Sequence, residues 1–75
     1  MPARSTPRYH RFSQNLYAQR VRAEWTQEKL AERLKISARY YQSLEAGTHA
    51  PSFELLMRMG KVLGCSWDDL LKDSN

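Results

Sequence analysis

The side chains with catalytic or metal-binding chemistry are few, and their spacing favours neither activity. Cys65 is the only cysteine, and the two histidines, His10 and His49, are far apart with no second cysteine to complete a ligand set. No nucleophile, base and orienting group recur at a catalytic spacing, and no glycine-rich phosphate loop is present. We therefore expect no enzyme activity, metal, cofactor or small-molecule ligand.

Arginine and lysine side chains offer another chemistry, which is binding to an anionic partner. The 75 residues carry a formal net charge of +4. The excess lies at the N-terminal end, because residues 1–22 contain five arginines and no acidic residue, whereas acids balance bases in residues 23–47. This distribution suits a polyanion, and it is equally typical of a solvated basic tail.

Length and composition predict one small globular unit. A chain of this length can bury a single hydrophobic core, and no apolar run approaches the ~18 residues of a membrane span. The N-terminus lacks the apolar stretch of a secretory signal, which makes a cytoplasmic protein the expectation. We expect one domain over residues 11–73, preceded by a flexible basic arm over residues 1–10.

Apolar spacing and capping residues predict five helices, over about residues 11–23, 27–34, 38–46, 52–63 and 67–72. The last four helices each begin near a residue that can cap an N-terminus: Thr26, Ser37, Ser52 and Ser66. Gly60 lies inside the fourth helix and predicts close packing of helices there rather than a kink. No segment alternates with the period of a strand. The fold class is therefore all-α, a compact five-helix bundle in which a tight turn joins two short helices.

The predicted helix over residues 38–46 has an outward face with hydrogen-bonding side chains. If Tyr41, Leu44 and Glu45 face the core, a rotation of about 100° per residue turns a second set outward. That set comprises Arg39, Ser43 and Ala46, flanked by Gln42, with Ala38 at the exposed first turn. A guanidinium matches the two acceptors of guanine, and a carboxamide can pair with adenine or a phosphate. The alternative for Arg39 is a solvated charge on a helix surface.

Four short motifs resemble the helix-turn-helix domain of the phage repressor and Cro family, also called the XRE family. The motifs are Thr26-Gln27-Glu28 with Leu30-Ala31, then Ile36-Ser37, Leu44-Glu45-Ala46-Gly47 and Pro51-Ser52. The resemblance covers about residues 12–71 and implies a lambda repressor-like DNA-binding fold. It also implies that helices 27–34 and 38–46 form the DNA-reading unit, with helix 38–46 in the major groove.

The sequence departs from the family pattern at three positions. Glu24 and Lys35 stand where glycine is usual, and the bulky Trp25 precedes the threonine cap. A non-glycine residue held at positive φ costs on the order of 1 kcal/mol, so Lys35 is expected to weaken the turn without changing the fold.

The resemblance also implies roles for side chains around the DNA-reading unit. Base contacts are expected from Ala38, Arg39, Gln42 and Ser43, and contacts to the DNA backbone from Gln27, Tyr40, Thr48 and His49. The resemblance implies that Arg4, Arg8 and Arg11 act as an arm over or into a DNA groove, as such arms do in some relatives, and simple disorder is the alternative. The plainer interpretations are a solvated Gln27, a Tyr40 packed on its own helix, and a His49 without a role.

Two further expectations concern structure and assembly. Arg20 and Glu45 fall on inward helix faces and match a paired arginine and glutamate in the family, so we expect a partly buried ion pair. The last helix carries more apolar area than a short terminal helix needs, which makes Trp67 and Leu71 candidates for a dimer interface, with core packing as the alternative for this side.

These features predict a sequence-specific, repressor-like transcriptional regulator that binds double-stranded DNA. A monomer of this fold would read only about four base pairs, so a homodimer on a palindromic operator is expected. Phage repressor, antitoxin and restriction controller fit this description equally well. The competing hypothesis is a protein-interaction module that kept the fold and lost DNA reading, since fold does not imply function.

Overall fold

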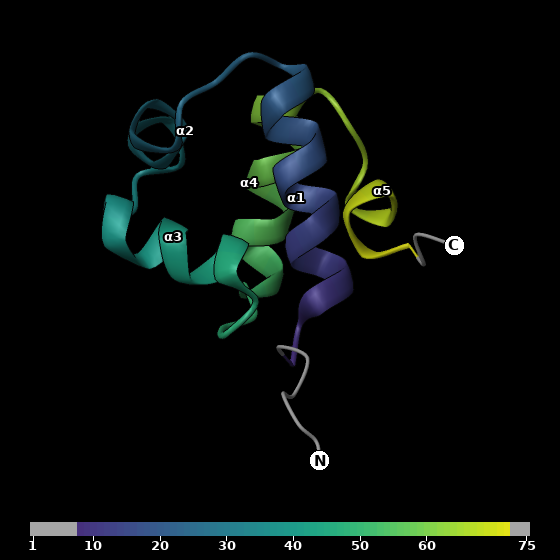
Figure 1. Ribbon diagram of the computed structural model, residues 1–75. Helices are drawn as coiled ribbons and strands as arrows, with labels where there is room; N and C mark the ends of the chain where they lie inside the picture. The colour runs from purple at the N-terminus through teal and green to yellow at the C-terminus, as the bar shows by residue number, and fades with distance from the viewer. Residues whose placement is uncertain (1–7, 73–75) are drawn as a thin grey trace.

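A computed structural model describes residues 8–72, which form five α-helices and no strand (Figure 1). The helices are α1 (His10–Arg22), α2 (Gln27–Leu34), α3 (Ala38–Ala46), α4 (Phe53–Leu63) and α5 (Trp67–Leu71). The all-α fold class is confirmed, and α2 and α3 have their predicted bounds. The other helices differ from the expected bounds by one residue, because α1 starts and ends earlier, α4 starts after its Ser52 cap, and α5 ends earlier.

Side-chain hydrogen bonds define the starts of four helices. The Thr26 hydroxyl accepts a hydrogen bond from the Lys29 N–H at 3.0 Å, and a serine does the same at the start of α3, α4 and α5. The first residue before α1 is Tyr9, which has no side-chain cap. No capping residue marks the start of α1 in the sequence. The helix begins at His10, which was expected to belong to the flexible arm over residues 1–10.

The core takes side chains from all five helices and fixes their relative positions. In Figure 1, α1 lies between the α2–α3 pair and α5, with α4 behind it. The largest fully buried side chains are Leu16, Leu30, Leu34, Tyr41, Leu44, Met59 and Leu70. Because Tyr41 and Leu44 are both 0% exposed, α3 has one rotational setting against the core.

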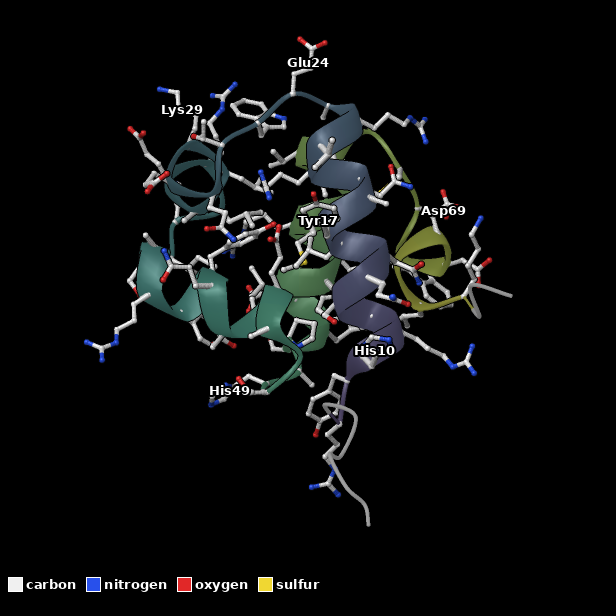
Figure 2. All side chains as sticks on the ribbon, in the orientation of Figure 1. His10, Tyr17, Glu24, Lys29, His49 and Asp69 are labelled. Carbon is white, nitrogen blue, oxygen red and sulfur yellow. The ribbon has the colours of Figure 1, made fainter. Side chains whose placement is uncertain are left out.

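Both non-glycine departures from the family pattern adopt the left-handed conformation. Glu24 and Lys35 each have φ 63°, and Glu24 points away from the molecule at the α1–α2 connection (Figure 2). The expected positive φ of Lys35 is thus confirmed. The turn is held by a hydrogen bond from the Ile36 N–H to the Ala31 carbonyl and by one from Arg58 to the Leu34 carbonyl, at 3.0 and 2.9 Å.

The described part of the chain has no helix that is long and apolar enough to cross a membrane. Within the same residues, no three histidine, cysteine or acidic side chains are grouped so that they could hold a metal ion.

Gly60 packs directly against the backbone of the connection between α4 and α5. A Cβ placed on this residue would lie 2.6 Å from the Cys65 carbonyl oxygen. Gly60 therefore marks a close approach, as predicted, but the prediction that another helix packs there is wrong. Its neighbour is a connecting loop rather than another helix.

Gly60→Ala is expected to lower the free energy of unfolding by about 1–3 kcal/mol, because the new methyl group displaces backbone atoms that cannot rotate away. At an ordinary helix position, Gly→Ala would raise the free energy of unfolding by about 0.5–1 kcal/mol. The direction of the change therefore distinguishes a tight contact from an ordinary helix position. Urea unfolding monitored by circular dichroism measures the effect. Gly64→Ala is the control, since its Cβ would meet nothing within 4 Å and only its φ of 72° is unfavourable. A Gly60→Ala midpoint at or above that of the wild type would show that the contact is not tight.

Candidate nucleic-acid interface

The exposed side of α3 presents the side chains that were expected to contact bases. Arg39 and Gln42 are exposed, and Ala38 and Ser43 are partly buried. The burial of Tyr41 and Leu44 on the opposite side of the helix causes this orientation. The four expected base-contacting residues therefore share one side of α3, where planar donor groups at Arg39 and Gln42 face solvent.

A second group of residues joins α3 to the connection that follows it. The Thr48 hydroxyl donates to the Ser43 carbonyl at 3.1 Å, and its oxygen lies 3.0 Å from Nδ1 of His49. The rings of Tyr40 and His49 meet edge to face, with centroids 6.3 Å apart. Figure 2 shows His49 on the connection that follows α3. The structure thus brings three of the expected backbone-contacting residues, Tyr40, Thr48 and His49, into one cluster.

The fourth expected backbone-contacting residue, Gln27, is the first residue of α2. The N–H groups of Gln27 and Glu28 precede the first intrahelical hydrogen bond, and together with the helix dipole they make this end suitable for an anion. The Gln27 side chain is half-buried, and its Nε2 donates to Oε1 of Glu45 at 2.8 Å. This contact was not predicted. It shows that Gln27 is not a plain solvated side chain.

Glu45 is the centre of a polar network that joins α1, α2 and α3. Its Oε2 accepts hydrogen bonds from Nε of Arg20 and from the Tyr41 hydroxyl, both at 2.5 Å. Its Oε1 accepts from Gln27 and, at 3.3 Å, from Nη2 of Arg20. The Arg20 and Glu45 side chains are only 14% and 7% exposed, so the expected ion pair is present and mostly buried.

The network keeps each of its ionisable groups in one protonation state. Burial acts to raise the pKa of Glu45, but the hydrogen bonds from Arg20, Tyr41 and Gln27 outweigh it and hold that pKa below its ordinary value. Burial, reinforced by Glu45, raises the pKa of Tyr41 far above its ordinary value. The hydrogen bond to Glu45 raises the pKa of Arg20. At neutral pH the carboxylate is therefore charged and faces only donors.

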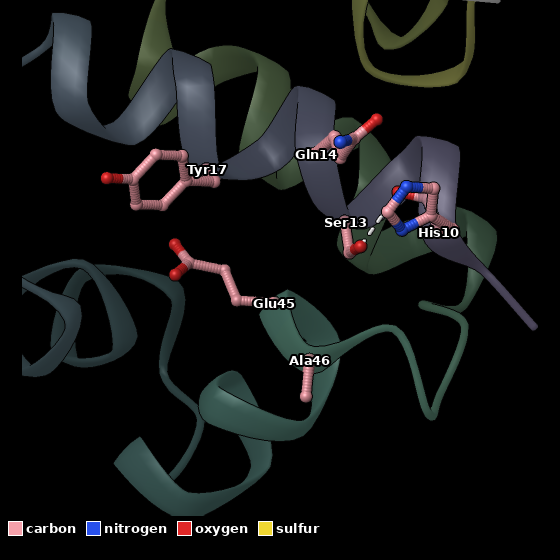
Figure 3. A pocket seen from close by; sticks show the side chains of 6 residues that line it. All are labelled: His10, Ser13, Gln14, Tyr17, Glu45 and Ala46. Carbon is pink, nitrogen blue, oxygen red and sulfur yellow. Dashed lines mark hydrogen bonds between the residues drawn. The ribbon is translucent and has the colours of Figure 1, made fainter. Parts of the chain in front are cut away.

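A shallow pocket of about 400 Å³ adjoins this network between α1 and α3 (Figure 3). It is lined by His10, Ser13, Gln14, Tyr17, Glu45 and Ala46. Tyr17 faces Glu45 across it, and the Ser13 hydroxyl is already bonded to the His10 carbonyl at 2.8 Å. No sequence pattern had indicated this pocket, because its walls come from helices distant in the chain.

The expected arm and dimer residues lie in different places. Arg4 lies outside the described residues. Arg8 and Arg11 are exposed, and the chain next to Arg8 is fixed at the end of α3 by a 3.0 Å hydrogen bond from the Tyr9 N–H to the Gly47 carbonyl. The dimer candidates lie beyond α1 on α5 (Figure 1), where Trp67 is 44% and Leu71 47% exposed, while Leu70 between them is fully buried. The apolar side of α5 is thus divided between core and solvent.

Glu45→Gln is expected to lower the free energy of unfolding at pH 7 by about 2–4 kcal/mol, because it leaves the Arg20 guanidinium mostly buried without its counter-charge. The pKa of Glu45 is lower in the folded than in the unfolded chain. Its stabilising contribution is therefore complete above the unfolded pKa and is lost as the pH falls through the folded pKa, so the difference between wild type and variant should shrink below about pH 4. Denaturant unfolding at several pH values measures both effects.

The matched control for this prediction is Glu32→Gln. Glu32 is an exposed carboxylate 3.6 Å from Lys29, and its loss should change stability by less than about 1 kcal/mol. Equal costs for the two variants would mean that the buried network contributes no more than a surface ion pair.

Comparisons with known proteins connect this geometry to a family. A model of the helix-turn-helix family matches residues 16–70. The uncharacterised HTH-type transcriptional regulator YqaE of Bacillus subtilis is 34% identical over 61 residues, which is 81% of this chain and 53% of YqaE. The chain therefore spans about half the length of that relative.

Two solved structures show how far the fold extends. The crystal structure of the clp gene regulator ClgR from Corynebacterium glutamicum superposes with a TM-score of 0.82 at 30% identity, covering 93% of this chain and 90% of that one. Hydroxypropylphosphonic acid epoxidase from S. wedmorenis also gives a TM-score of 0.82, at 21% identity, covering 95% of this chain and 38% of that one. The fold is thus shared by a regulator and by part of an enzyme. The match to the family model and the similarity to YqaE at 34% identity and to ClgR at 30% identity identify the family more specifically than the fold does. This chain belongs to the helix-turn-helix family of the XRE type.

Proposed function

We propose that this chain is a transcriptional regulator that binds double-stranded DNA sequence-specifically, with α3 in the major groove. The observation that carries the proposal is the orientation of α3. Fully buried Tyr41 and Leu44 turn Arg39 and Gln42 to solvent. The start of α2, which suits an anion, contacts Glu45 of α3. The names of YqaE and ClgR, both regulators, support the same function.

The exposed groups of α3 have distinct abilities to read bases. Arg39 can donate two parallel hydrogen bonds to guanine, and the Gln42 amide can pair with adenine. The Ser43 hydroxyl donates to the Tyr40 carbonyl at 2.6 Å, so in this conformation it offers only lone pairs to a base. Ala38 adds a methyl group that suits an apolar contact. Together they would favour a site with at least one guanine in each half.

Contacts to the DNA backbone would come from two groups of residues. Gln27 lies at the start of α2 and contacts Glu45 near the end of α3, while Tyr40, Thr48 and His49 join α3 to the connection that follows it. Arg8 and Arg11 are exposed basic residues near the N-terminal end of the chain. Their long-range attraction to phosphates would add affinity for DNA without sequence information.

We further propose that the chain acts as a repressor-like homodimer on a palindromic operator. One α3 helix reads about four base pairs, and two-fold symmetric half-sites provide the missing discrimination. Exposed Trp67 and Leu71 on α5 are large apolar side chains that a second copy could cover.

Arg39→Ala is expected to weaken binding to the preferred duplex about 5- to 100-fold and to remove the preference at one base pair in each half-site, because a bidentate base contact is lost. Gln27→Ala should weaken preferred and mismatched duplexes by similar factors, since a phosphate contact carries no sequence information. The preferred duplex is first selected from a random library, and binding is then measured by fluorescence anisotropy on single-mismatch duplexes at fixed salt.

The control for Arg39→Ala is Arg33→Ala, which removes the same charge from the surface of α2, where Arg33 stacks on Trp25 with 5.2 Å to the ring centroid. It should leave the mismatch profile unchanged. A full wild-type profile for Arg39→Ala would show that α3 does not read bases, and would favour a protein-interaction module.

Trp67→Ala is expected to weaken self-association at least tenfold, because it removes the largest exposed apolar side chain of α5. Sedimentation equilibrium over a wide concentration range, with and without the selected duplex, measures the dimer constant. Phe53→Ala removes an exposed aromatic side chain of α4 and is the control. A wild-type monomer both free and on DNA would contradict the dimer, and an effect of Phe53→Ala alone would move the interface to α4.

A further inference from the structure

The hydrogen bond between Gln27 and Glu45 links the start of α2 to the end of α3. A carboxylate can only accept hydrogen bonds, so the 2.8 Å contact requires that Gln27 directs its amide nitrogen toward Glu45. One of the two N–H bonds of that nitrogen is used in this contact. The second N–H lies in the same plane but points in a different direction, so it remains available to another acceptor.

We infer that Glu45 is a positioning residue for DNA binding, which acts by holding the Gln27 amide so that its second N–H meets a DNA phosphate. This inference rests on the proposed function. It assigns the buried carboxylate a role beyond stability, because a free glutamine side chain would have to be ordered when DNA binds, at a cost in conformational entropy. A glutamine already held by Glu45 avoids most of that cost.

The division of donors between the two Glu45 oxygens supports this role. Oε2 takes the short contacts from Arg20 and the Tyr41 hydroxyl, while the shorter of the two contacts to Oε1 comes from Gln27. Tyr41 therefore helps to hold the carboxylate without competing for the oxygen that Gln27 uses.

Arg20 makes this arrangement compatible with a nearby polyanion. An unpaired carboxylate behind the start of α2 would repel phosphate, whereas the bidentate contact with the guanidinium offsets its charge. Nη1 of Arg20 also donates to the Trp25 carbonyl at 2.9 Å, which fixes the chain two residues before Gln27. The same ion pair thus holds both the backbone and the side chain at the proposed phosphate contact.

The experiment compares the cost of Gln27→Ala in three backgrounds by duplex binding. In the wild type the change should weaken binding about tenfold, uniformly across matched and mismatched duplexes. In Arg20→Met/Glu45→Met, which removes the pair without leaving an unpaired charge, it should weaken binding less than threefold, because Gln27 is no longer held. Lys29→Ala/Glu32→Ala is the matched control, since it removes an exposed ion pair of α2 outside the Glu45 network, and Gln27→Ala should again cost about tenfold there.

A second measurement tests the arrangement in the free protein. In ¹⁵N-labelled wild type, the two side-chain amide protons of Gln27 should be widely separated in chemical shift, and Lys29→Ala/Glu32→Ala should preserve the separation. The methionine pair should reduce it to that of a free amide. A separation in the wild type no larger than that of a free glutamine amide would overturn the inference even if the methionine pair does not fold.

The outcomes separate this inference from the proposed function. A wild type that binds no duplex would overturn the proposed function. Equal tenfold costs of Gln27→Ala in the wild type and in the methionine pair would overturn the positioning role while DNA binding stands. Complete loss of binding by a folded methionine pair would also overturn it, because one phosphate contact accounts for only about a tenfold effect.

Discussion

The arrangement of this protein depends on a buried carboxylate that meets only donors. Removing a carboxylate from water costs several kcal/mol, and the cost is offset only when the remaining lone pairs are satisfied. Glu45 meets that requirement with hydrogen bonds from Arg20 on α1, Gln27 on α2 and Tyr41 on its own helix. Two apolar side chains in place of Arg20 and Glu45 could stabilise the fold equally well. Apolar contacts have no preferred direction, so they would allow many small displacements of α2 and α3. The directional contacts to one carboxylate restrict those shifts and thereby set the distance between the start of α2 and the exposed side of α3.

This restriction explains how so small a domain tolerates two strained residues next to its most constrained helices. Glu24 and Lys35 each cost on the order of 1 kcal/mol in the left-handed region, a substantial fraction of the stability that such a chain can have. Glu24 is followed by Trp25, whose carbonyl is held by Arg20, and Lys35 is followed by Ile36, whose N–H closes the end of α2. Each strained residue thus lies directly before an anchored one, so relaxing its φ would break contacts on both sides of α2.

The sequence predicted most of the fold because the signals that define it are local. Thr26, Ser37, Ser52 and Ser66 mark helix starts through hydrogen bonds to residues three positions later, and α2 and α3 were accordingly located to the residue. The start of α1 was displaced because Tyr9 offers no cap. The pairing of Arg20 with Glu45 was foreseeable, since the pattern placed opposite charges on two inward faces.

The contacts that complete the candidate site were not predictable in the same way. Gln27 and Glu45 are 18 residues apart on different helices, and Gln27 was expected to contact the DNA backbone rather than another side chain. Only the crossing of α2 and α3, which results from the packing of Leu30, Leu34 and Leu44, brings the amide to the carboxylate. Contacts of this kind depend on the three-dimensional arrangement, and no periodicity in the chain encodes them.

The central helix α1 separates the two surfaces that a dimeric regulator would need. In Figure 1, α3 and α5 lie on opposite sides of α1. Arg20 of α1 donates to Glu45 of α3, and the buried Asn15 of α1 donates to the carbonyls of Leu70 and Lys72 at 3.0 and 2.8 Å. Both side chains come from one rigid helix of 13 residues, so α3 and α5 are attached to a common axis by polar contacts of defined direction. The separation between the proposed base-reading surface on α3 and the proposed association surface on α5 is then set by α1 rather than by a flexible connection. Because half-site spacing on DNA is fixed by the duplex, a rigid link of this kind is what a two-fold assembly of such domains requires.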